Sequence, residues 1–157
     1  MGDKILFPNE NIITTKYFDV HQDWEVPIPG FFIIAPLRKL KSISEFTDEE
    51  AVDFINITRK VREGMRDILK IEEVYFFQNE DTKHNFHLWA FPRHNWMEIF
   101  GKKIESVRPI MNYAKENMLS DDVLKEVKEG VKKMREYMSD FYYKKVSTSS
   151  LHFVQDK

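Results

Sequence analysis

Three side chains suited to chemistry alternate along one short apolar segment in the middle of the chain. The segment runs Asn85-Phe86-His87-Leu88-Trp89-Ala90-Phe91-Pro92-Arg93. In a strand, successive side chains point to opposite faces, so Asn85, His87 and Trp89 are expected to lie in one row, about 7 Å apart. An imidazole between two groups that can hydrogen-bond is suited to act as a nucleophile or a base.

A β-hairpin is expected to position this row. Residues 73–78 contain the run Val-Tyr-Phe-Phe and predict a strand, and residues 79–82 predict a turn. The returning strand is expected over residues 83–91. Its other face carries Phe86, Leu88 and Ala90, which are apolar and suited to packing against a helix. His84 falls on this other face, away from His87.

That helix is predicted from Thr47 to about Lys70. Thr47 and Glu50 have the spacing of a capping box, and apolar residues follow at positions 54, 57, 61, 65 and 68. Gly64 interrupts the pattern at a cost of about 1 kcal/mol relative to alanine, so packing at this position must compensate.

The first part of the chain supplies the remaining strands. Residues 1–11 are expected to be a loose arm, residues 12–20 a strand, residues 23–30 a loop rich in proline, and residues 31–35 a strand buried on both faces. This order predicts an α+β fold, with an antiparallel sheet of about five strands and a central helix packed on one face.

Helices are expected beyond residue 104. Ser106 and Ser120 are the predicted caps, and apolar residues at 124, 127, 131, 134, 138 and 141 alternate steps of three and four. This seam is expected to pack against the domain or against a twin subunit. The chain is expected to be one domain, with a core over residues 1–103 and a C-terminal helical extension over residues 104–157.

Composition excludes several classes of function. The chain has 157 residues, a formal net charge of −2 and no cysteine, so it offers no disulfide or thiolate metal site and no general attraction for nucleic acid or an anionic membrane. The N-terminal residues lack a signal-peptide pattern and no apolar run is long enough to span a membrane, so a cytoplasmic protein is expected. No metal site is expected, because His84 and His87 would share a face only in a helix.

The segment from Asn85 to Arg93 resembles the nucleotide-binding strand of the histidine-triad family. That family carries three histidines at alternate positions, often followed by Pro-Arg, and here Asn, His and Trp occupy the three positions. Two upstream segments, residues 29–39 and 42–50, resemble the family's sequence in the same order. The resemblance covers roughly residues 12–100 and favours the branch similar to bacterial diadenosine polyphosphate hydrolases, some of which carry C-terminal extensions.

The resemblance implies a function and a set of site residues. His87 takes the place of the family's nucleophile, which attacks the α-phosphorus of a nucleoside polyphosphate. Asp23 takes the place of an acid that binds the ribose hydroxyls, and Trp24 and the Phe31-Phe32 region are expected to form a slot for the base. Three further residues are expected near the phosphates: Asn79, Thr82 and Lys39. The resemblance also implies a homodimer formed through the central helix and the sheet edge. It implies no cofactor.

Two departures from the family pattern leave alternatives open. Asn85 can both donate and accept hydrogen bonds, but the indole of Trp89 cannot release its proton near neutral pH. Trp89 therefore cannot be a general acid, which favours substrates with good leaving groups. The first alternative is a nucleotide-binding module with little or no catalysis. The second is an α+β dimer that acts through its C-terminal helix seam.

Overall fold

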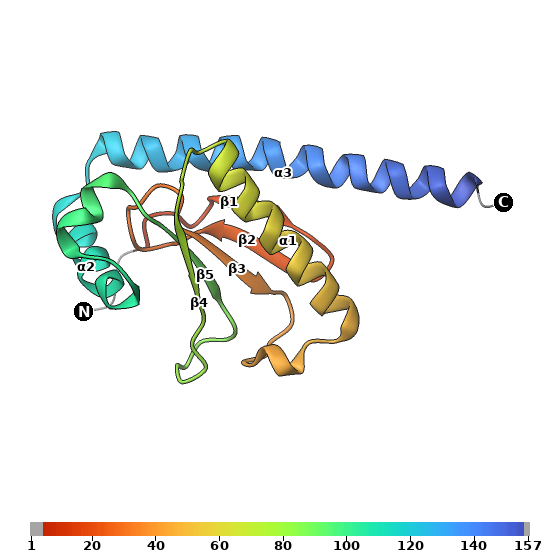
Figure 1. Ribbon diagram of the computed structural model, residues 1–157, viewed down its shortest axis with the longest axis horizontal. Helices are drawn as coiled ribbons and strands as arrows, with labels where there is room; N and C mark the ends of the chain where they lie inside the picture. Colours follow the sequence, from red (N-terminus) through yellow and green to blue (C-terminus); the bar gives the residue numbers. More distant parts are fainter. Residues whose placement is uncertain (1–4, 156–157) are drawn as a thin grey trace.

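A computed structural model of the chain describes the backbone of residues 5–155 and the side chains of residues 5–142. The strands are β1 (Asn11–Thr14), β2 (Phe18–Gln22), β3 (Phe32–Pro36), β4 (Val74–Phe77) and β5 (Leu88–Pro92), and the helices are α1 (Asp48–Asp67), α2 (Val107–Asn117) and α3 (Asp121–Gln155). The strands form one antiparallel sheet in the order β1-β2-β3-β5-β4 (Figure 1). The α+β prediction is therefore confirmed.

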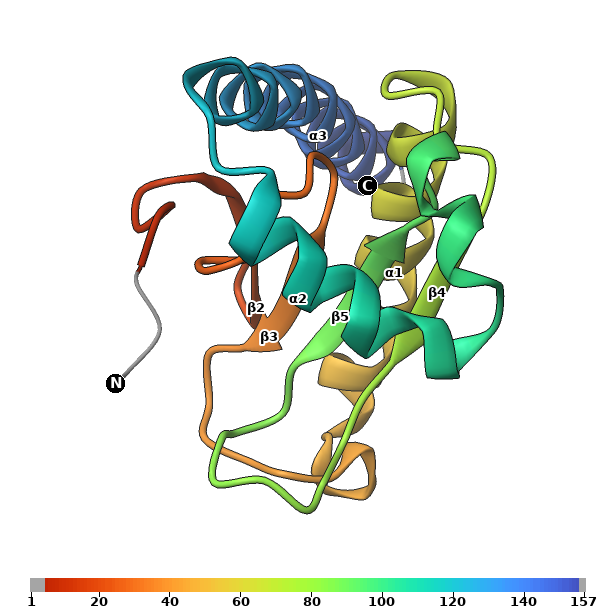
Figure 2. The same cartoon turned by 90° about the vertical axis from the view of Figure 1, so that its left-hand side faces the viewer.

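The sheet has helices on both faces. On one face α1 and α3 cover an apolar core with Phe32, Ile34 and Ala90, whereas on the other face α2 covers a second core with Phe31, Ile33 and Phe91 (Figures 1 and 2). Adjacent residues of β3 thus lie in different cores, which confirms the prediction of a strand buried on both faces. The fold was predicted with its central helix on one face of the sheet. The structure adds α2 on the opposite face.

Helix α1 is capped and positioned as its sequence predicts. The Thr47 hydroxyl accepts a hydrogen bond from the backbone N–H of Glu50, and the Glu50 carboxylate accepts one from that of Thr47. A Cβ at Gly64 would lie 3.0 Å from side-chain atoms of both Met134 and Tyr137 on α3. The glycine therefore permits α1 and α3 to pack closely, and this packing compensates for its low helix propensity.

The predicted strand over residues 12–20 is wrong, because the chain turns back within it. The Thr15 hydroxyl accepts hydrogen bonds from the backbone N–H groups of Tyr17 and Phe18, at 3.3 and 3.0 Å. A threonine side chain thus closes the turn between β1 and β2 without glycine or proline. The hairpin extends β2 to Gln22, which brings His21 into the sheet.

The returning strand of the second hairpin is shorter than predicted. Strand β5 begins at Leu88, and residues 83–87 lie outside the sheet. The Phe86 N–H donates to the carbonyl of Leu40 instead of to a sheet partner, at 2.7 Å. The loops 37–47 and 78–87 therefore lie side by side, and Figure 2 shows them together at the lower end of the molecule, beyond α2.

The N-terminal segment packs on the domain, and one of the two predicted caps of the C-terminal helices is present. Phe7 is buried and its N–H donates to the Trp24 carbonyl, so the expected loose arm is wrong from residue 5 onwards, and residues 1–4 lie outside the described part. Ser120 caps α3 through the N–H of Val123. Ser106 precedes α2, but its hydroxyl donates to the Lys103 carbonyl, so its predicted capping bond is wrong.

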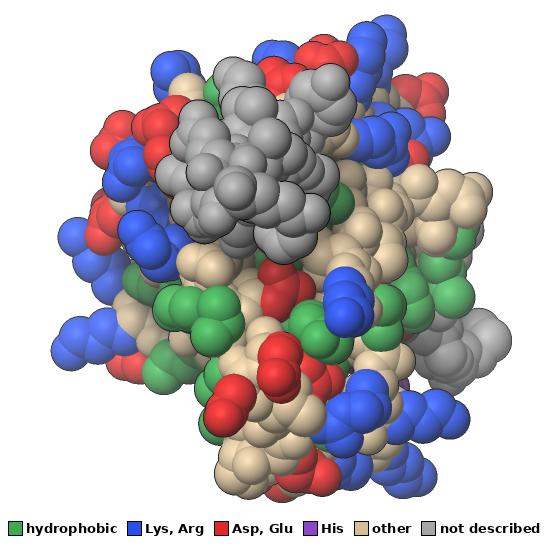
Figure 3. All heavy atoms as spheres, turned by 90° about the vertical axis from the view of Figure 1, so that its right-hand side faces the viewer, with side chains coloured by type: hydrophobic (Ala, Val, Ile, Leu, Met, Phe, Trp, Pro, Cys, Tyr) green, Lys and Arg blue, Asp and Glu red, His purple; other side chains and the backbone are tan. Residues whose placement is uncertain are grey.

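The apolar seam of α3 packs against its own domain. Four residues of this seam are completely buried, namely Val127, Val131, Met134 and Met138. The last three belong to the core that α3 shares with the sheet and α1. No helix within residues 5–155 combines the length and apolar composition that crossing a membrane requires. Figure 3 shows positive, negative and hydrophobic side chains interspersed on one side of the molecule, in keeping with the nearly neutral net charge.

Candidate functional site

His87 lies where the second loop enters β5, and its side chain is half-buried. Burial is the main cause that lowers the pKa of His87 below its usual 6.5, and positive charge on His21 and His84 lowers it further. The imidazole is therefore uncharged at neutral pH, which is the form that can act as a nucleophile.

His21 and Asp19 form a charge pair on β2, on the same side of the sheet as His87. The Nδ1 atom of His21 lies 2.8 Å from the Asp19 carboxylate, which also accepts hydrogen bonds from Thr14 and Asn11. Burial raises the pKa of Asp19, but these bonds outweigh it and lower the pKa below its ordinary value. Sequence reasoning missed this pair. Its signal was an acid and a histidine two residues apart, which share a face once β2 is recognised.

His84 lies close to His87, which contradicts its predicted place on the opposite face. The two rings stack with their centroids 6.2 Å apart. The reason is that residues 83–87 do not continue the strand, so strict alternation of side chains does not apply to them. Asn85 is exposed, and within the described residues its side chain makes no hydrogen bond to His87. The three predicted positions thus do not form a regular row.

Trp24 and Asp23 lie in the loop that follows β2. The Trp24 indole is 46% exposed and stacks on the His21 ring at 5.0 Å, so it presents an aromatic face beside the histidines. One oxygen of Asp23 accepts hydrogen bonds from the backbone of Glu25 and Val26, which fixes the turn. Burial raises the pKa of Asp23, whereas these bonds and nearby positive charge oppose that rise.

Trp89 lies in an aromatic row beneath α2. Its ring packs 4.8 Å from Phe77 and 5.8 Å from Phe31, and the side chain is half-buried. Phe31 is completely buried in the same core, and Phe32 belongs to the core on the opposite face. The Phe32 side chain therefore cannot line a base slot on the His87 side, and that part of the prediction is wrong.

The three residues expected near phosphate lie in the two paired loops and are exposed. The Thr82 carbonyl accepts a hydrogen bond from the Lys41 ammonium group, and the Thr82 hydroxyl accepts one from the N–H of His84. Lys39 precedes Leu40, whose carbonyl holds Phe86, the neighbour of His87. Asn79 follows β4 on the same loop as His87. The paired loops thus bring all three near the end of the sheet where His87 lies.

The floor between the histidines is small and apolar. Asp19 pairs with Ala35 across β2 and β3, and His21 pairs with Ile33, which in turn pairs with Trp89 on β5. The pairing of β3 with β5 ends at Ile34 and Leu88, so His87 lies just beyond the paired residues, at the end of β3 that carries Ala35. Alanine has a short side chain, so no long side chain of β3 covers the sheet surface beside Asp19.

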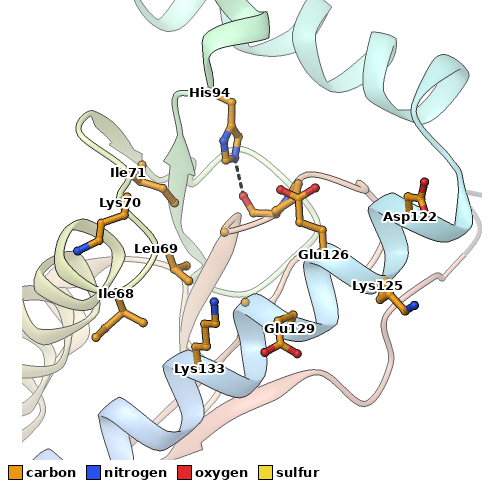
Figure 4. Close-up of a pocket in the computed structure, with 13 residues that line it drawn as sticks. Ile68, Leu69, Lys70, Ile71, His94, Asp122, Lys125, Glu126, Glu129 and Lys133 are labelled. Atoms are coloured by element: carbon orange, nitrogen blue, oxygen red, sulfur yellow. Dashed lines mark hydrogen bonds between the residues drawn. The ribbon is translucent and has the colours of Figure 1, made fainter.

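A separate cleft of about 570 Å³ lies between the C-terminal end of α1, the loop at Pro29 and α3 (Figure 4). The Nε2 atom of His94 lies 2.6 Å from the Pro29 carbonyl at its edge. Acidic and basic side chains face it together, namely Asp122, Glu126, Glu129, Lys70, Lys125 and Lys133. This balance gives no preference for a polyanion, and His87 does not line the cleft.

Within the described residues, no group of three His, Asp or Glu side chains is arranged to hold a metal ion. The rings of His84 and His87 stack on each other, whereas the His21 ring stacks on Trp24. The chemistry that these residues offer is that of an uncharged imidazole, an imidazole paired with a carboxylate, and an exposed aromatic face.

Comparisons with known proteins place the fold. No protein-family model matches the chain, and no curated protein matches its sequence. Among solved structures, it is similar to a Zn-bound histidine triad family protein from Mycobacterium smegmatis, with 15% identity, a TM-score of 0.59 and coverage of 87% of this chain and 88% of the other.

Two further structures have the same fold. A Hit-like protein involved in cell-cycle regulation from Bartonella henselae is 14% identical, with a TM-score of 0.55 and coverage of 81% and 85%. A member of the HIT family from Bacillus subtilis is 18% identical, with a TM-score of 0.52 and coverage of 73% and 92%. The chain therefore has the fold of histidine-triad proteins, as its sequence resemblance predicted.

Proposed function

We propose that the chain is a nucleotide hydrolase or nucleotidyl transferase that uses His87 to attack the α-phosphorus of a nucleoside polyphosphate. The observation that carries this proposal is the His87 imidazole, which burial and two neighbouring histidines keep uncharged. It lies on the histidine-triad fold beside side chains suited to a nucleotide, and the sequence around it resembles the family's nucleotide-binding strand.

The reaction divides into two in-line displacements. In the first, a lone pair of the His87 imidazole forms a bond to phosphorus, and the bond from phosphorus to the bridging oxygen breaks as the remaining phosphates leave. In the second, water or another acceptor attacks the nucleotidyl-imidazole and releases His87. Dividing one difficult displacement into two easier ones is the general advantage of covalent catalysis.

The surrounding residues have separate roles in binding. The exposed face of Trp24 is suited to stacking with a base, and Asp23 is suited to accepting hydrogen bonds from two ribose hydroxyls. Lys39, Asn79 and Thr82 are proposed to bind phosphate oxygens from the two paired loops. Because the whole molecule is nearly neutral, this local set must provide the attraction for the polyanion.

A direct test is to incubate the protein with diadenosine tetraphosphate and measure AMP and ATP. The wild-type protein is expected to produce both in equal amounts, and His87→Ala is expected to produce neither. His84→Ala is the matched control, because it removes a histidine from the same loop and is expected to retain activity within a few-fold at neutral pH. Equal turnover by the wild-type protein and His87→Ala would rule out the proposed nucleophile.

The second candidate function is nucleotide binding with little or no catalysis. The packing of Trp89 in an aromatic row and the exposure of Asn85 favour it, because neither residue supports His87 as a histidine would. Calorimetry separates the two candidates. Tight AMP binding without turnover supports the binding module, whereas no rise of melting temperature at millimolar nucleotide contradicts both candidates.

A further inference from the structure

The pair formed by Asp19 and His21 has no part in the reaction proposed for His87, although it is extensively hydrogen-bonded on the same face of the sheet. Three donors converge on the Asp19 carboxylate: the His21 imidazole, the Thr14 hydroxyl and the Asn11 amide. A carboxylate that accepts the Nδ1–H of a histidine fixes the orientation of the ring and leaves Nε2 to face away. Trp24 stacks on the same ring and restricts it further.

The position of His21 relative to His87 suits an in-line reaction. Strands β2 and β5 both flank β3, so they are about 10 Å apart, and Ala35 and Ile33 of β3 lie between the two histidines. On β2, Asp19 lies opposite Ala35, and His21 lies one same-face position further along, opposite Ile33. A phosphorus above β3 between Ala35 and Ile33 would have His87 on the β5 side and His21 on the β2 side. In an in-line displacement, the leaving oxygen departs on the side opposite the nucleophile, which is the side of His21.

We propose that His21 is the proton donor for the leaving group, in the role that Trp89 cannot perform. This inference rests on the proposed function of His87. In the first step, the protonated His21 gives its Nε2 proton to the bridging oxygen as the bond from that oxygen to phosphorus breaks. In the second step, the neutral His21 takes a proton from the water that attacks the nucleotidyl-His87, which restores both histidines.

This assignment widens the class of substrates. A nucleoside polyphosphate leaves without help, whereas a phenol or an alcohol of low acidity must be protonated as it departs. With His21 as donor, the protein is expected to hydrolyse nucleoside monophosphate esters of weakly acidic alcohols and phenols. If no residue replaced the acid function that Trp89 lacks, such esters would not be substrates.

The test compares two esters of AMP that differ only in the leaving group, 4-nitrophenol or phenol. His21→Asn is the informative variant, because the asparagine amide can still donate to Asp19 in place of Nδ1 but has no atom in place of Nε2. We expect His21→Asn to lower kcat for the phenyl ester by about 100-fold or more, and for the 4-nitrophenyl ester by only a few-fold. Wild-type kcat is expected to differ little between the esters.

Two further variants complete the experiment. Asp19→Asn removes the anionic partner but leaves His21. We therefore expect kcat to fall for the phenyl ester only, and by less than in His21→Asn. His87→Ala is expected to abolish turnover of both esters. If His21→Asn lowers kcat equally for both esters, or for neither, then His21 is not the donor. The proposed function of His87 is unaffected by either result. If the wild-type protein hydrolyses neither ester, then the proposal for His21 is wrong, whereas turnover retained by His87→Ala would mean that both proposals are wrong.

Discussion

At the scale of single residues, the protonation state of His87 decides whether the proposed reaction can start. The ring is half-buried and lies near two other imidazoles, so charging it costs desolvation and repulsion from positive neighbours. A histidine in these surroundings stays neutral at lower pH than a free one. His21 and His84 are the titratable groups whose charge acts on it.

The acid limb of the pH profile provides a prediction. Protonation of His87 removes the nucleophile, so kcat/KM for diadenosine tetraphosphate should fall with decreasing pH around a midpoint below 6.5. In His84→Ala one positive neighbour is gone, and the midpoint should move upwards towards 6.5. Steady-state rates between pH 4.5 and 8 measure both midpoints. An unchanged midpoint in His84→Ala would mean that charge on His84 does not lower the pKa of His87.

The site was only partly predictable from sequence. His87 and Trp24 were predicted as site residues from their residue types and from the family resemblance. His21 was assigned no role, because the predicted strand ended at Val20 and left the residue outside it. The turn between β1 and β2 depends on a hydrogen bond to the Thr15 side chain. It contains no glycine or proline, so nothing in the sequence indicated it.

At the scale of elements, the contact between α1 and α3 depends on Gly64. Alanine at position 64 would meet the buried Met134 and Tyr137 at 3.0 Å, whereas alanine at position 130 of α3 would lie 3.8 Å from Leu69. Both substitutions gain about 1 kcal/mol of helix propensity. Only the one at position 64 also overpacks a core, at a cost of about 1–3 kcal/mol.

We therefore expect Gly130→Ala to raise the free energy of unfolding by about 1 kcal/mol and Gly64→Ala to leave it unchanged or lower it by up to about 2 kcal/mol. Chemical denaturation of the two variants beside the wild type gives both values. Equal stabilisation by the two alanines would show that the contact between the helices yields easily and that Gly64 has no packing role.

The start of α1 is joined to the first of the two loops near His87 by an ion pair. Arg38 donates to both oxygens of the buried Glu50 at 2.9 and 3.2 Å, and these bonds, with that from Thr47, lower the pKa of Glu50 from 4.5 to about 2. Since the folded pKa lies below the unfolded one, the stabilisation is complete above pH 4.5 and is lost as the pH falls towards 2.

Glu50→Gln should remove this dependence on pH. The melting temperature of the wild-type protein should exceed that of the variant at pH 7, and the difference should shrink steadily between pH 4.5 and 2. Thermal unfolding followed by circular dichroism at several pH values measures it. A difference between the two proteins that stays constant across this range would mean that Glu50 does not contribute through its charge.

At the scale of the whole molecule, large apolar side chains are exposed beside one free edge of the sheet. Strand β4 has a neighbour on one side only, and Phe76 on this strand is 41% exposed. On α1, Val52 and Ile55 are 61% and 52% exposed. A cleft lined by Phe76 and by Thr58 and Arg62 of α1 shows that the outer side of the helix adjoins this strand. These features support the homodimer that the family resemblance implies.

Sedimentation equilibrium tests this assembly. We expect a particle of twice the chain mass for the wild-type protein and a monomer for Ile55→Glu, which would bury a charge in the interface at a cost of several kcal/mol. Ile99→Glu is the control, because Ile99 is 83% exposed on a segment far from α1 in the sequence and outside the proposed interface. A monomeric wild-type protein at micromolar concentration would contradict the proposed dimer.

The covalent intermediate on His87 is the central claim, and its mass tests that claim most directly. The protein is mixed with diadenosine tetraphosphate, quenched within milliseconds under alkaline conditions that preserve phosphoimidazoles, digested and analysed by mass spectrometry. We predict one added adenylyl group on the peptide that contains His87, and none in the His87→Ala protein. Turnover to AMP and ATP without any adenylyl group on this peptide, or with the group on another residue, would contradict the account.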